Sequence, residues 1–150
     1  MTRLVLLLGV LLLMPSPVLA QQLELSVSPV VITFPSSDPD TVPLVSAAPV
    51  QVTYRIRANG SSPWSLTALA AGDLNSGPSR VDISNITWVA TPAPPFQNGT
   101  LSRTVAQRVA SGNGNVNPNT IGSITFRLAN SWTYDTGTYT QTILFTLSAP

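Results

Sequence analysis

The side chains that most often carry enzyme chemistry are missing from this sequence. It contains no histidine, cysteine or lysine, which excludes Ser-His-Asp and Cys-His nucleophile systems, histidine or thiolate metal sites and lysine Schiff bases. Carboxylate chemistry remains, and in a glycosidase it needs two carboxyl groups that face each other across a cleft. Beyond residue 20 the acidic residues are few and lie mostly in expected turns: Glu24, Asp38, Asp40, Asp73, Asp82 and Asp135. We expect no catalytic residues and no cofactor.

One acidic pair deserves a separate test as a metal site. Asp38 and Asp40 flank Pro39 and would offer carboxylate oxygens to calcium, a hard cation. No ladder of Asp, Asn and Gly accompanies them, and two acids around a proline are common in ordinary loops. We therefore expect a loop here and no metal ligands.

The aromatic residues divide into a core set and a candidate binding pair. Trp132 and Tyr134 flank an expected turn between the last two strands, where aromatic rings can stack on a sugar or on a partner. The alternative is that they cover the end of the core. We take Trp132 and Tyr134 as candidate ligand-binding residues. The remaining aromatics of interest fall on inferred inward faces, namely Tyr54, Trp64, Trp88, Phe126, Tyr139 and Phe145.

The elements that must position these residues are β-strands, because apolar and polar residues alternate and no sustained 3.6-residue period occurs beyond residue 20. The clearest strand has Val50, Val52, Tyr54 and Ile56 on one face and polar residues on the other. Pro29 should mark an edge or a kink, since proline cannot donate to a ladder. The expected strand regions are 23–34, 50–57, 64–68, 81–90, 101–110, 124–128 and 139–148.

Turn chemistry separates these regions. Asn59-Gly60 predicts a hairpin between residues 50–57 and the next strand, and Gly137 is expected to need a positive φ in the turn 134–137. Loops are expected at 35–49, 72–80 and 112–118. About seven short strands favour an antiparallel immunoglobulin-like β-sandwich, without the Cys-Trp-Cys pattern of antibody domains. Its predicted core contains Val52, Tyr54, Trp64, Trp88, Phe126 and Phe145.

Residues 1–20 have the order of a cleavable signal peptide. Arg3 precedes an apolar run from Leu4 to Met14, and the segment closes on Val18-Leu19-Ala20. The alternative is a permanent anchor, but the run is shorter than the roughly 20 residues of a membrane span. We therefore expect export to the cell surface or the extracellular space, with one β-sandwich domain over residues 21–150. That domain has six arginines and six acids, which argues against nucleic acid and anionic membranes as partners.

Trp64-Ser65-Leu66 is a Trp-x-Leu triplet, and a closing strand that begins Gly137-Thr138-Tyr139 contains the similar triplet Phe145-Thr146-Leu147. Together with Ile86-Thr87-Trp88, these segments resemble the WxL-type surface domains of bacteria. The resemblance implies a non-catalytic domain that attaches to the cell wall or assembles with other surface proteins. Phenylalanine replaces tryptophan in the distal triplet, so the family's attachment motif is altered.

Two functions compete on this sequence. The first is an exported structural or adhesion module whose partners are a cell-wall polymer or other surface protein subunits. The alternative is a small carbohydrate-binding domain that uses Trp132 and Tyr134. For the first function, strand 23–34 is a candidate for strand addition to a neighbouring subunit, whereas its simplest role is to complete its own sheet.

Overall fold

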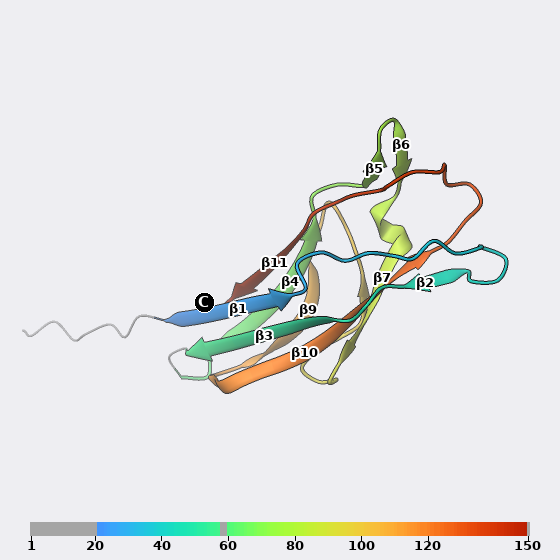
Figure 1. Ribbon diagram of the computed structural model, residues 1–150. Coiled ribbons are helices and arrows are strands. Elements are labelled where there is room, and N and C mark those ends of the chain that lie inside the picture. Colours follow the sequence, from blue (N-terminus) through green and yellow to red (C-terminus); the bar gives the residue numbers. More distant parts are fainter. Residues whose placement is uncertain (1–20, 58–59, 150) are drawn as a thin grey trace, which may run out of the picture.

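The structure, a computed structural model, describes residues 21–57 and 60–149 as an all-β protein built from antiparallel sheets (Figure 1). This confirms the expected fold class at the level of β architecture. The expected signal peptide, residues 1–20, lies outside the described residues. Among the residues that are described, no helix is long and apolar enough to cross a membrane.

The larger sheet has β1 at one edge and a long central strand, β10. The order is β1-β3-β10-β7-β8, and β2 pairs with β10 beyond the end of β3. β1 therefore completes its own sheet by pairing with β3 along its whole length. The strands are β1 (Gln22–Ser28), β2 (Leu44–Ser46), β3 (Val50–Arg57), β7 (Ile86–Thr91), β8 (Gly99–Thr100) and β10 (Val116–Ala129).

The smaller sheet has three strands in the order β11-β4-β9. A separate two-stranded hairpin precedes a short 3₁₀ helix, η1 (Ile83–Asn85). The strands of these two sheets are β4 (Pro63–Ala70), β5 (Leu74–Ser76), β6 (Ser79–Val81), β9 (Gln107–Asn113) and β11 (Ile143–Ser148).

One core lies between the two larger sheets. Alternate residues of β3 and β4 are buried, as the period-2 pattern predicts, and the rings of Tyr54 and Trp64 meet across the interior with centroids 5.1 Å apart. Of the predicted core residues, five are buried: Val52, Tyr54, Trp64, Trp88 and Phe126. Phe145 is only half-buried and packs against this cluster, because β11 is an edge strand of the smaller sheet.

The large core rings lie on glycines. Trp64 is directly opposite Gly112, and Trp88 is directly opposite Gly99. A Cβ on Gly99 or Gly112 would come within 2.3 or 2.6 Å of the facing indole, and one on Gly122 within 2.1 Å of Phe96. Glycine at these positions lets an aromatic ring cover the backbone of a neighbouring strand. Phe96, which follows a proline-rich stretch, was not among the predicted core residues.

The predicted hairpin at Asn59-Gly60 is wrong. Gly60 does have a positive φ of 70°, but β3 and β4 do not pair; they lie in different sheets. The chain crosses here from the six-stranded to the three-stranded sheet, so both strands bury their apolar faces against each other. An alternating pattern on both sides of a turn is compatible with either arrangement.

Several boundaries also differ from the sequence prediction. Residues 30–34 form no strand, and Val30 and Val31 are exposed. The expected loop 72–80 contains β5 and most of β6. The expected loop 112–118 is mostly strand, because β9 and β10 leave only residues 114–115 between them. The expected strand 101–110 is regular only from residue 107, and a register shift in β9 makes the consecutive residues Val109 and Ala110 both buried.

Gly137 does not have the positive φ that the turn pattern predicted. Glycine fits at position 137 for a different physical reason: an added Cβ would lie 2.3 Å from the hydroxyl oxygen of Ser76. The last strand begins only at Ile143, although the predicted alternation of its faces is confirmed as half-buried and exposed residues.

Candidate functional site

Trp132 lies on a turn that follows the end of β10. The backbone N–H of Tyr134 donates to the carbonyl of Ser131 at 3.3 Å, and the hydroxyl groups of Ser131 and Thr133 are 2.8 Å apart. These contacts form a compact turn over residues 131–134. Trp132 is 69% exposed, which is unusual for the largest apolar side chain and marks it as a candidate contact residue.

A carboxylate from a distant loop holds the Trp132 indole. Its Nε1 donates to Oδ1 of Asp40 at 3.1 Å. Asp38 shapes the same loop, since its Oδ1 accepts the backbone N–H of Asp40 at 2.8 Å. The two acids noted as a possible calcium site thus have a different role: one orders the loop and the other fixes a tryptophan. No group of three or more potential metal-ligating side chains occurs among residues 21–57 and 60–149.

Asn130 joins this loop to the end of β10. Its side-chain amide donates to the carbonyls of Ser37 at 2.9 Å and Val42 at 3.2 Å, and its backbone N–H donates to the carbonyl of Pro43 at 2.9 Å. The loop that carries Asp38 and Asp40, called the acid loop below, and the turn 131–134 therefore lie at the same end of the molecule (Figure 1). This end lies away from the start of β1 and the C-terminus.

Tyr134, the second candidate residue, is placed differently from Trp132. Its side chain is half-buried and packs against the core, and its hydroxyl donates to the carbonyl of Ala129 at 3.0 Å. Burial raises the pKa of Tyr134 above its ordinary value. The structure thus leaves one of the two predicted rings open to solvent and uses the other to hold the turn in place.

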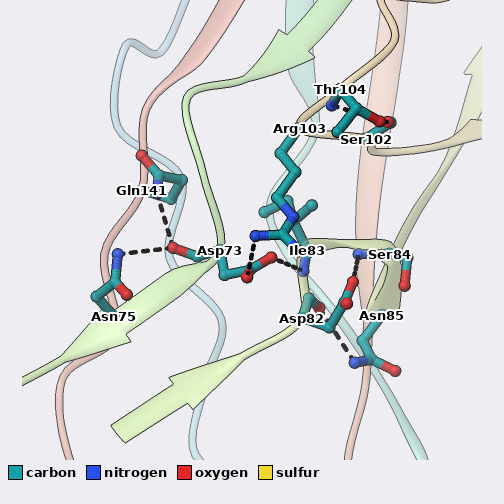
Figure 2. Close-up of polar contacts among 10 residues, drawn as sticks. All are labelled: Asp73, Asn75, Asp82, Ile83, Ser84, Asn85, Ser102, Arg103, Thr104 and Gln141. Carbon is teal, nitrogen blue, oxygen red and sulfur yellow. Dashed lines mark hydrogen bonds and ion pairs between the residues drawn. The ribbon is translucent and has the colours of Figure 1, made fainter. Parts of the chain in front are cut away.

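A second polar cluster surrounds Asp73, between β4 and β5 (Figure 2). Its Oδ2 pairs with Arg103 at 3.0 Å and its Oδ1 accepts the backbone N–H of Ile83 at 3.2 Å. The carbonyl of Asp73 also accepts from Asn75 and from Gln141, at 2.8 and 2.7 Å. Four chain segments meet at this residue. Because both carboxylate oxygens are occupied by protein donors, the arrangement suits a structural clamp rather than proton transfer.

Asp82, beside this cluster, caps η1. Its Oδ1 accepts the backbone N–H of Ser84 at 2.8 Å, and its carbonyl accepts from the side chain of Asn85 at 3.1 Å. Hydrogen bonds from the Ser84 side chain and backbone hold the pKa of Asp82 below its ordinary value. This is the expected behaviour of an N-cap aspartate.

The two Trp-x-Leu-like triplets come together on neighbouring strands. Leu66 of β4 is directly opposite Leu147 of β11, and Ser65 is opposite Ser148, with their hydroxyl oxygens 3.1 Å apart. The outer face of this sheet carries a shallow, open hollow. It is lined by Pro63, Trp64, Ser65, Arg108, Ser111, Gly112, Asn113 and Ser148.

Sequence reasoning identified Trp132 but missed Asp40 as its hydrogen-bond partner and Asn130 as the residue that fixes the Asp40 loop to the end of β10. Trp132 and Asp40 are 92 residues apart, and no local pattern connects them. A weak signal did exist, because the acidic pair was tested as a metal site and the aromatic pair in a late turn was taken as a candidate binding pair.

No protein-family model and no curated protein matches this chain.

Proposed function

We propose that this chain is an exported, non-catalytic module of the cell surface or extracellular space, with an immunoglobulin-like β-sandwich fold, that binds cell wall or assembles with other surface proteins. The expected signal peptide and the resemblance to WxL-type domains support export and surface location. The two antiparallel sheets around one core support the sandwich.

The observation that carries the assembly role is the position of β1. It is the edge strand of the larger sheet and contributes no fully buried side chain, since every buried core residue lies at Val45 or later. Its face toward the core is only half-buried, at Leu25 and Val27. An edge strand has a row of backbone groups available for pairing with another chain. Strand addition at this edge would require no rearrangement of the core.

The charges along this edge are few. Glu24 faces Arg55 on the neighbouring strand, with Oε1 and Nη1 3.8 Å apart. The other residues on the outer face of β1 are Gln22, Ser26 and Ser28. Charged side chains are a common protection of edge strands, and here the one acid already has a partner of opposite sign.

The test measures association of the mature protein, residues 21–150, by light scattering over a range of concentrations and by co-sedimentation with isolated cell walls. We expect self-association, capture of a co-secreted surface protein or retention on walls. A protein that stays monomeric and binds neither partner would overturn the proposal.

A matched pair of variants tests whether β1 is the assembling edge. Ser26→Lys with Ser28→Lys places charges on exposed positions of β1, while Thr136→Lys places one on an exposed loop. We expect the first variant to lose association and the second to retain it, with both remaining folded by circular dichroism. Equal association of the two would mean that another surface carries the assembly.

A further inference from the structure

The turn 131–134 and the neighbouring loop that carries Asp40 form a region that we call the Trp132 corner. In it, the Trp132 indole is highly exposed and yet has a fixed orientation. Trp132 is 69% exposed, yet its indole N–H is engaged by Asp40 and its turn is closed by hydrogen bonds from Thr133 and Tyr134 to Ser131. A tryptophan that merely covered the core would bury its ring faces, as Trp64 and Trp88 do. Here the hydrogen bond at the edge of the ring orients the side chain and leaves most of its surface in solvent.

The supporting structure is also ordered in advance. Asn130 binds the carbonyls of Ser37, Val42 and Pro43 and so fixes the acid loop to the end of β10. Asp38 closes the turn that presents Asp40. Ordering side chains and loops on binding normally reduces affinity. A site whose ring and acid are already held avoids much of that loss.

The chemistry of the corner limits its ligand. The indole offers a flat apolar surface, and the second carboxylate oxygen of Asp40 has no hydrogen-bond partner among the described residues. Carboxylates accept hydrogen bonds only, so this oxygen suits hydroxyl donors. Within the described chain neither Asp38 nor Asp40 forms an ion pair, and their charges would repel an anion. A quaternary ammonium would favour an aromatic cage, but Tyr134 is packed against the core.

We propose that Trp132 and Asp40 form a binding site for a neutral saccharide, with the indole stacked on the apolar face of a sugar ring and Asp40 accepting from its hydroxyl groups. The site resembles small-ligand sites in general, in which an apolar surface is combined with a few placed polar groups. The inference rests on the proposed function, because it gives wall binding a defined site and ligand class. It assigns no part to β1.

The tryptophans themselves provide the readout. The chain has three, and Trp64 and Trp88 are buried, so acrylamide quenching of tryptophan fluorescence reports mainly on Trp132. The probes are cellotetraose and the tetramer of N-acetylglucosamine, with tetragalacturonate as an anionic comparison and benzyltrimethylammonium as a cationic one. We expect a neutral tetramer to protect the exposed tryptophan from acrylamide in a saturable manner, and the two charged probes to give no protection.

Variants assign the effect to the two residues. By calorimetry, Trp132→Ala should weaken binding of the protective tetramer by at least about tenfold, as loss of a central aromatic contact does. Trp132→Phe should weaken it less, because a ring face remains. Asp40→Asn should weaken binding severalfold, and Leu144→Ala, an exposed apolar residue on β11, should have no effect.

Three results would overturn the site. Binding that is unchanged in Trp132→Ala and Asp40→Asn would place the saccharide elsewhere and leave wall binding intact. If neither neutral tetramer binds to protein that still associates through β1, the saccharide site is wrong and the assembly role stands. Preference for the cationic or the anionic probe would show that the ligand class is wrong.

Discussion

The core and the Trp132 corner both contain tryptophan, but they position it by opposite means. Trp64 and Trp88 lie on glycines of the neighbouring strands, so each indole covers backbone and is buried. None of the glycines in residues 21–57 and 60–149 would place a Cβ against Trp132, whose indole is instead held at its edge by a carboxylate. In the first arrangement, burial of the ring stabilises the fold. In the second, the ring surface remains available for contact with another molecule. Whether a tryptophan is buried therefore depends on the space that its neighbouring residues leave for the ring.

The largest effect is expected in the core. Trp88→Ala removes a ring that fills the space above Gly99 and whose Nε1 donates to the carbonyl of Gln97 at 2.9 Å. We expect a loss of about 3–5 kcal/mol in the free energy of unfolding, measured by urea denaturation. A loss below about 1 kcal/mol would mean that the interior is not packed as described.

Adding a side chain at the glycines beneath the rings should destabilise the fold, just as removing a ring does. Gly122→Ala places a methyl group 2.1 Å from the Phe96 ring, and overpacking of this kind costs about 1–3 kcal/mol. The control is Ser123→Ala on the next residue of β10, whose side chain is only half-buried. If the two variants unfold at the same urea concentration, the ring does not lie on the glycine.

The two acid clusters extend the comparison to polar residues. Asp73→Ala leaves the backbone N–H of Ile83 without its acceptor in a partly buried place and removes the pair with Arg103. We expect a loss of about 1–2 kcal/mol, most of it from the backbone contact because Arg103 is half-exposed.

Asp40→Ala serves as the matched control for that measurement, since its carboxylate is exposed and, among the described residues, accepts a hydrogen bond only from the Trp132 indole N–H. Its effect on the unfolding midpoint should be clearly smaller than that of Asp73→Ala. Equal losses would show that the contact between Asp40 and Trp132 contributes as much to stability as the contacts of Asp73.

The smallest effect on stability is expected at Trp132 itself. Trp132→Ala should change the free energy of unfolding by within about 0.5 kcal/mol, as exposed substitutions usually do, while the acrylamide-accessible part of the fluorescence should nearly disappear. A stability loss comparable to that of Trp88→Ala would identify Trp132 as a core cover and remove the contrast between the two regions.

Much of the fold was predictable because alternation is a local property. Residues 50–57 and 64–68 reveal their inward faces through side-chain identity alone, since successive residues of a strand point to opposite faces. β1 is an edge strand, as Pro29 suggested, but Pro29 itself lies just beyond the end of β1 and not within the expected strand 23–34. Local signals failed where irregular backbone buries apolar residues, as at Phe96 and Leu101.

From the sequence alone, the β architecture, five of the six predicted core residues and the candidate Trp132 could be identified. Tertiary structure alone decided that β3 and β4 separate into two sheets, that glycines lie beneath the rings, and that Asp40 meets Trp132. The reason is the sequence separation of the contacts. The two-residue period is encoded within each strand, whereas strand partners and contacts between loops depend on which distant edges and chain ends pack together. A single sequence encodes those contacts only through the complete fold.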